Sequence, residues 1–159
     1  MVPRCLHIGG GRLSVGPKLK PGCLPDSVGV VVTLIQDSEG AAAIGRALEG
    51  VVVWKHLPFS TRKLRDVLPV EFTYALEQLM IDLWNGSHVH VHCLEGLHRT
   101  GIFTYGLLRM MGCDQFDAMD VLSMLRPESA RALTTPLREW TETTIRKGFR
   151  QGWSGRLKN

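Results

Sequence analysis

Residues 92–101, with the sequence HCLEGLHRTG, join two apolar segments of different character. The run before them contains Val89 and Val91 and predicts a short buried strand. Segment 102–111 is apolar enough to predict a buried helix, which Gly112 would end. A loop between a strand and the first turn of a helix gathers backbone N–H groups at the positive end of the helix dipole. We therefore expect an anion-binding loop here, and phosphate is the usual anion bound in this way.

The residue types in this loop predict phosphate chemistry. Gly96 lets the backbone turn without a Cβ clash, and Arg99 offers a planar fork that matches two phosphate oxygens. Cys93 stands at the foot of the loop, where positive surroundings favour the thiolate over the thiol. A thiolate beneath an anion seat is an activated nucleophile directed at phosphorus. The expected phosphate-binding residues are Leu94, Glu95, Gly96, Leu97, His98 and Arg99.

The order His92, Cys93, five residues, Arg99 and Thr100 resembles the signature loop of the cysteine-dependent protein tyrosine phosphatases. Because the chain is short, it resembles their compact (atypical) dual-specificity type in particular. The resemblance implies that Cys93 forms a phosphocysteine intermediate and that Arg99 binds the phosphoryl group. It also implies that Thr100 stabilises the leaving thiolate and that His92 orders the loop. The competing interpretation is a buried structural cysteine before a helix that happens to carry an arginine.

The general acid is the weak point of this resemblance. In the family, a mobile loop carries an aspartic acid that protonates the leaving oxygen and later activates water. The corresponding positions are residues 61–63, and none of them is acidic. Asp66 is the nearest carboxylate and our candidate, with Glu71 behind it. The remaining alternative is that no protein group donates the proton, which a substrate with a good leaving group would tolerate.

The sequence favours an anionic substrate without selecting one. The net charge is +4 and the pI is near 9.1. We expect a phosphorylated protein, hydrolysed at phosphotyrosine, phosphoserine or phosphothreonine. Residues 98–101 resemble those of atypical plant and fungal phosphatases, whose preference includes inositol pyrophosphates, but Leu94 and Glu95 replace the basic pair of those enzymes. An inositol (pyro)phosphate or an RNA 5′-phosphate is therefore the alternative substrate, and a phosphate-binding module without useful turnover is the alternative function.

Three histidines, His88, His90 and His92, alternate on one face of the predicted strand. With Cys93 and His98 nearby, this spacing could indicate a zinc site. Such a site would need a further ligand facing the strand, and the sequence offers no evident cluster. We therefore expect no metal and no cofactor, and we expect His88 and His90 to be partly exposed.

Composition indicates one globular domain. The chain has 159 residues, of which 44% are apolar, and lacks an apolar run long enough to span a membrane. Its N-terminus lacks a signal-peptide pattern, and its four cysteines show no CxxC spacing, so we expect reduced thiols in the cytoplasm. We also expect a monomer.

The predicted fold class is α/β, with a central, mostly parallel sheet flanked by helices on both faces. A single phosphatase domain is expected over residues 1–159, with an irregular lead-in at 1–27 and a basic tail at 148–159. Residues 12–27 in particular are expected to be loop, although 4–8 could form a short strand. The expected strands are 28–35, 51–54 and 88–92, and the expected helices are 41–48, 69–84, 102–111, 114–125 and 135–147.

Overall fold

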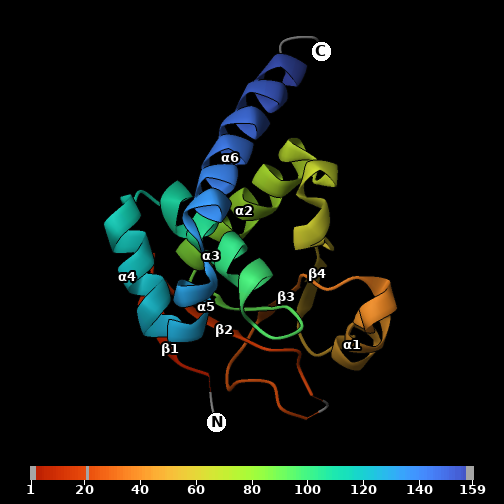
Figure 1. Ribbon diagram of the computed structural model, residues 1–159. Helices are drawn as coiled ribbons and strands as arrows, with labels where there is room; N and C mark the ends of the chain where they lie inside the picture. The colour runs from red at the N-terminus through yellow and green to blue at the C-terminus, as the bar shows by residue number, and fades with distance from the viewer. Residues whose placement is uncertain (1–2, 21, 157–159) are drawn as a thin grey trace.

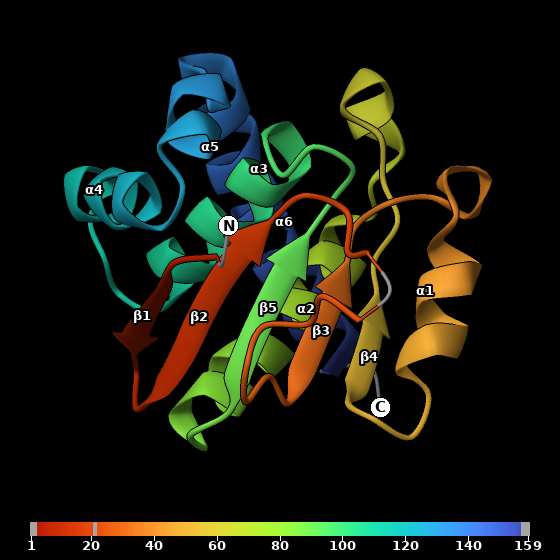
Figure 2. The ribbon, with the colours of Figure 1, turned by 90° about the horizontal axis from the view of Figure 1, so that it is seen from below.

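The computed structural model describes residues 3–20 and 22–156, with side chains through Gly152. It is an α/β domain built on one sheet in the order β1-β2-β5-β3-β4, in which only β1 runs antiparallel to its neighbour (Figures 1 and 2). The predicted fold class is therefore confirmed. The strands are β1 (Cys5–Ile8), β2 (Gly11–Gly16), β3 (Val30–Thr33), β4 (Val53–His56) and β5 (His88–His92). The helices are η1 (Asp37–Glu39), α1 (Ala41–Leu48), η2 (Thr61–Asp66), α2 (Pro69–Trp84), α3 (His98–Met110), α4 (Gln115–Leu125), α5 (Pro127–Ala132) and α6 (Thr135–Arg156).

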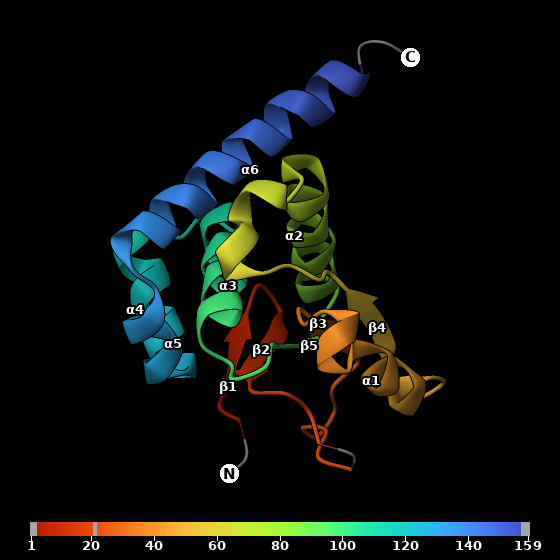
Figure 3. The ribbon, with the colours of Figure 1, turned by 45° about the vertical axis from the view of Figure 1, so that its right-hand side comes forward.

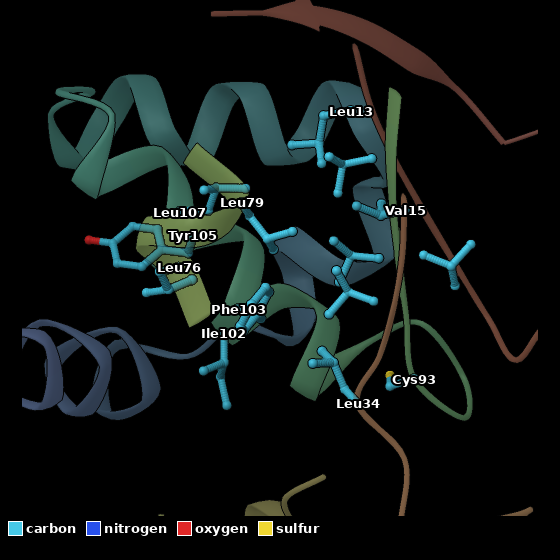
Figure 4. Close-up of a cluster of buried hydrophobic side chains, with 14 of the residues drawn as sticks. Leu13, Val15, Leu34, Leu76, Leu79, Cys93, Ile102, Phe103, Tyr105 and Leu107 are labelled. Carbon is cyan, nitrogen blue, oxygen red and sulfur yellow. The ribbon is translucent and has the colours of Figure 1, made fainter. Parts of the chain in front are cut away.

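The main core lies between the sheet and the helices α2 and α3. Val89 and Val91 of β5 and Leu13 of β2 contribute to it and are fully buried. Helix α6 packs on the outer side of α2 and α3, so it forms a further layer over this face (Figure 3). Cys93 lies at the edge of the apolar cluster (Figure 4), so the nucleophile candidate packs against the core.

The second face of the sheet is covered more lightly. Helix α1 packs beside β4, and the segment that joins β2 to β3 crosses in front of the central strands (Figure 2). This segment contacts the sheet directly, because the carbonyl oxygen of Asp26 lies 3.1 Å from Nδ1 of His88. Both faces of β5 are thus buried, as expected for a central parallel strand.

The expectation that residues 12–27 are loop was wrong for the first part of that segment. Residues Gly11–Gly16 form β2, which pairs in parallel with β5. Leu13 and Val15 are buried in the core, which is the physical reason for the strand. Flanking glycines and prolines concealed this short alternation in the sequence. Part of the expected irregular lead-in is therefore a hairpin, β1 and β2, whose turn at Gly9 and Gly10 has positive φ.

The C-terminal part also differs from expectation. Helix α6 continues to Arg156 instead of ending near residue 147. Gly148 lies inside α6, at the point where α6 crosses α2. A Cβ there would overlap Thr73, so the close crossing requires a glycine. Helix α5, which begins with Pro127, was not predicted. Residues 1, 2, 21 and 157–159 of the expected lead-in and tail lie outside the described residues.

No helix in the described ranges is both long and apolar enough to cross a membrane.

Candidate active site

The loop between β5 and α3 lies at the carboxyl edge of the parallel strands, where open α/β sheets bind ligands. A cavity of about 330 Å³ opens above it. Three segments of the chain line this cavity: the loop itself, the turn after β3 and the segment after β4. The lining residues are Gln36, Glu39, Ser60, Thr61, Arg62, Cys93, Leu94, Glu95, Leu97, His98 and Arg99.

The first two carbonyl groups of the loop are held by donors outside it. Nδ1 of His92 lies 3.3 Å from the carbonyl oxygen of Cys93. The backbone N–H of Lys18, just after β2, donates to the carbonyl oxygen of Leu94 over 2.9 Å. These contacts fix how the loop leaves β5, and the second links it to the segment that follows β2.

The next two carbonyl groups are held from α5 and the residue before it. The guanidinium of Arg126 donates to the carbonyl oxygen of Glu95 over 3.2 Å, and the hydroxyl of Ser129 donates to that of Gly96 over 2.5 Å. In a trans peptide the N–H of the following residue points opposite to the carbonyl, and the described chain has no cis peptide bond. The N–H groups of residues 94–97 therefore point away from these anchors, and they are free to bind an anion.

Gly96 is required by this geometry for two reasons. Its φ is +70°, a left-handed conformation that other residues rarely adopt. A Cβ at this position would also lie 2.6 Å from the carbonyl oxygen of Gly16 and 2.7 Å from the nitrogen of Pro17. The close contact between the loop and the end of β2 thus depends on a glycine.

Cys93 lies at the base of the cavity, where its sulfur accepts a hydrogen bond. Its side chain is 3% exposed, and the hydroxyl of the buried Thr100 donates to its Sγ over 3.1 Å. Thr100 lies in the first turn of α3, whose positive end faces the same point. Of the predicted residues, His92, Cys93, Arg99 and Thr100 therefore come together with the loop.

Arg99 is fixed by an acid that we did not predict from the sequence. Its two terminal nitrogens donate to the two carboxylate oxygens of Glu39 over 2.7 and 2.8 Å, and one of them also donates to the carbonyl of Phe59 over 3.3 Å. The hydrogen bond from Arg99 lowers the pKa of Glu39 to about 2. The hydrogen bond to Glu39 in turn raises the pKa of Arg99, and the Cys93 sulfur adds a smaller contribution in the same direction.

A signal for Glu39 was present in the sequence. It follows the predicted buried strand 28–35, and the carboxyl ends of neighbouring parallel strands meet at one edge of a sheet. An acid at that edge could have been expected near Arg99.

Asp66 and Glu71 lie in a different place. They line a second cavity of about 150 Å³, which shares the lining residues Gln36 and Ser60 with the first. Within the described residues, the carboxylates that line the cavity above Cys93 are Glu39 and Glu95.

The alternating histidines are buried, so the expectation that His88 and His90 are partly exposed was wrong. The two side chains are 5% and 1% exposed. Ser14 Oγ lies 2.9 Å from a ring nitrogen of each. Burial lowers the pKa of His90 to about 3 and that of His92 to about 4, so both rings are neutral near pH 7. Over residues 3–20 and 22–156, no group of three or more His, Cys, Asp or Glu side chains could hold a metal ion.

No protein-family model and no curated protein sequence matches the chain. Solved structures do share its fold. Tk-PTP in its active form superposes with a TM-score of 0.72 at 19% identity, covering 92% of this chain and 99% of that one. A kinase-associated phosphatase with its catalytic-site cysteine replaced by serine gives 0.66 at 16% identity, covering 86% and 87%. Human DUSP28 gives 0.57 at 16% identity, covering 79% and 82%. The chain therefore has the fold of the compact cysteine-dependent phosphatases.

Proposed function

We propose that the protein is a cysteine-dependent phosphatase that hydrolyses phosphomonoesters, above all phosphotyrosine, phosphoserine and phosphothreonine in proteins. One observation carries the proposal: Cys93 Sγ accepts a hydrogen bond from Thr100 at the base of a cavity, beneath a loop whose carbonyl groups are held outward. The shared fold supports it, because the phosphatases named above have the same architecture.

The proposed reaction has two steps. The thiolate of Cys93 attacks phosphorus in line, so that a sulfur–phosphorus bond forms while the bond to the ester oxygen breaks. The amides of residues 94–97 and Arg99 bind the non-bridging oxygens, on which negative charge is concentrated. Water then attacks the phosphocysteine and releases inorganic phosphate, and the hydroxyl of Thr100 stabilises the thiolate that leaves.

We propose Asp66 as the general acid of the first step, brought in by a movement of the segment after β4. Helix η2 has a kink at Lys63, where φ is −131° and ψ is 44°, and we propose that the movement takes place there. Ser60 and Gln36 line both the main cavity and the cavity that contains Asp66, so the two cavities are neighbours. Closure of such a segment over bound substrate would also exclude water.

The charges around the cavity support a substrate with a single phosphoryl group. Arg62, Arg99 and His98 line it together with Glu39 and Glu95. Glu39 neutralises much of the charge of Arg99, and Glu95 adds a negative charge at the rim. An inositol (pyro)phosphate or an RNA 5′-phosphate would bring several negative charges to a mouth whose two arginines are balanced by two glutamates.

One observation favours a second function, a module that binds phosphate groups without useful turnover. Neither of the two carboxylates proposed as the acid lines the cavity above Cys93. Without a proton donor, phosphoserine and phosphothreonine would be poor substrates, because their leaving groups are strongly basic.

Hydrolysis of p-nitrophenyl phosphate and phenyl phosphate separates these functions. We expect wild-type protein to hydrolyse both esters and Cys93→Ser to hydrolyse neither, while Cys23→Ser, which changes an exposed thiol, retains wild-type rates. Asp66→Asn should slow phenyl phosphate more than p-nitrophenyl phosphate, because the phenolate needs the proton more. Equal effects on both esters would exclude Asp66 from proton transfer. If wild-type and Cys93→Ser protein both bind phosphopeptide and neither turns it over, the protein is the binding module.

A parallel panel addresses the substrate class. Phosphotyrosine and phosphothreonine peptides, an inositol polyphosphate and an RNA 5′-phosphate are compared by kcat/KM. We expect the highest value for a phosphopeptide. A value at least tenfold higher for the inositol polyphosphate or for the RNA would overturn the assignment to phosphoproteins.

A further inference from the structure

Thr33 and Trp54 lie on the sheet behind the candidate active-site loop and make hydrogen bonds that lead to it. Thr33 in β3 is the direct partner of His92 in β5 and of His56 in β4. Trp54 lies two residues before His56, so its side chain is on the same face of the sheet. Nε1 of Trp54 donates to Oγ1 of Thr33 over 2.8 Å, and Oγ1 of Thr33 lies 2.7 Å from Nε2 of His92.

The protons of this chain can be assigned one by one. An indole N–H is a donor only, so Thr33 Oγ1 must accept from Trp54. The hydroxyl has one proton of its own, and its other close partner is Nε2 of His92. If Nε2 of His92 were the protonated nitrogen, Thr33 would accept twice and its own proton would lack a partner in this buried site. Thr33 therefore donates to His92, and Nε2 is an acceptor.

The contact at Nδ1 of His92 indicates the same tautomer. Nδ1 lies 3.3 Å from the carbonyl oxygen of Cys93, which can only accept. An unprotonated Nδ1 would place two lone pairs face to face, whereas a protonated Nδ1 donates a hydrogen bond. The ring is neutral near pH 7 because burial lowers its pKa to about 4, so it carries a single proton. Both ends thus assign that proton to Nδ1.

Trp54 is itself held in place. Its ring stacks on that of His56 with centroids 5.1 Å apart. On its α1 side it packs against Gly45, where a Cβ would lie 2.7 Å from two atoms of the ring. The donor that begins the chain therefore has little freedom to turn away.

We propose that Thr33 and Trp54 are positioning residues: they fix the tautomer of His92, and through it the orientation of the Cys93 carbonyl that begins the anion-binding loop. This proposal deepens the phosphatase function proposed above, and its catalytic consequence rests on that function. The hydrogen bonds from Trp54 through Thr33 to His92 run across three adjacent strands, β4, β3 and β5 (Figure 2). In this proposal Trp54 donates to Thr33, Thr33 donates to His92, and His92 donates to the Cys93 carbonyl, so the geometry of the loop depends on all three donors.

The direct test is the protonation state of the His92 ring, observed by long-range ¹H–¹⁵N correlation NMR near pH 7. We expect wild-type His92 to carry its proton on Nδ1. Thr33→Val keeps the branched shape and removes the hydroxyl, and it should give a mixture of tautomers; Thr33→Ser should restore the Nδ1 form. Ser14→Ala is the matched control, because Ser14 contacts His88 and His90 on the same face of the sheet. It should leave the His92 signals unchanged.

The kinetic test links the tautomer to the site. Thr33→Val should lower kcat/KM for p-nitrophenyl phosphate about tenfold, Trp54→Phe should lower it less, and Thr33→Ser should restore it. A wild-type His92 protonated on Nε2, or His92 signals that Thr33→Val does not change, would overturn the proposal. If the Nδ1 form is present but wild-type protein has no phosphatase activity, the tautomer assignment stands and the proposed function fails.

Discussion

The buried histidines predict a steep loss of stability on mild acidification. His90 and His92 are neutral in the folded protein, with their pKa values lowered from 6.5 to about 3 and about 4 by burial. In the unfolded chain both rings titrate near 6.5, so between pH 6.5 and 4 the unfolded state binds more protons. Stability therefore falls as pH falls through this range. This is the sign expected for bases that are buried in the neutral form.

The magnitude follows from the separation between these pKa values. At pH 5, each ring is protonated in the unfolded state and still neutral in the folded state. The interval from the unfolded-state pKa of 6.5 to pH 5 is about 1.5 pH units, which corresponds to about 2 kcal/mol per histidine. The pair thus predicts a loss of about 4 kcal/mol between pH 7 and pH 5, a large part of the 5–15 kcal/mol typical of a domain. Glu39 contributes little in this window. Its folded-state pKa is lowered from 4.5 to about 2, so its contribution is lost only as pH falls below about 4.5.

Urea unfolding monitored by tryptophan fluorescence at pH 7 and pH 5 measures this loss. His90→Gln removes one of the two titrating rings and should reduce the loss to about half. His7→Gln is the control, because His7 is exposed, and it should leave the loss unchanged. A wild-type loss below about 1 kcal/mol, or the same loss in His90→Gln, would refute the argument from buried neutral rings.

Two further predictions concern the geometry of the loop. Glu39→Gln removes the charged partner of Arg99 and should lower kcat/KM for p-nitrophenyl phosphate roughly tenfold or more. Glu49→Gln, on the surface, is the control and should have no effect. Equal rates for Glu39→Gln and wild-type protein would contradict the role given to the pair of Glu39 and Arg99. Gly96→Ala combines a positive φ with an overlap on the Gly16 carbonyl and should destabilise the protein by roughly 2–4 kcal/mol, measured by urea unfolding. Gly50→Ala has a similar φ of +73° but no neighbouring atom within 4 Å, so it should cost only about 1 kcal/mol; an equal cost for both would show that the overlap is unimportant.

The sequence predicted those parts of the site whose residues are neighbours in the chain. Residues 92–100 specify a strand end, a turn that requires glycine and a helix start, and the structure has these features. The fold class was expected from the predicted strands and helices together with the resemblance of the loop to a known family. The β2 strand was missed because only Leu13 and Val15 indicate it among glycines and prolines. Its pairing with β5 is a tertiary contact, which local preference does not report.

Contacts over long sequence distances explain the remaining differences. Glu39 and Arg99 are 60 residues apart, and they meet because β3 and β5 are adjacent and parallel. The segment between β2 and β3 crosses the second face of the sheet (Figure 2), and its Asp26 carbonyl contacts the buried His88. The outward anchoring of the loop by Arg126 and Ser129 depends on α5. None of these arrangements follows from a periodic pattern.

The central claim is that the sulfur of Cys93 takes up the phosphoryl group, and the most direct measurement is the mass of the protein during turnover. Wild-type protein is mixed with p-nitrophenyl phosphate and quenched in acid within the first turnovers, and its peptides are examined by mass spectrometry. We predict that the peptide containing Cys93 gains the mass of one phosphoryl group, and that Cys93→Ser protein gains none. Turnover without any phosphorylated Cys93, or a phosphoryl group found on another residue, would contradict the account.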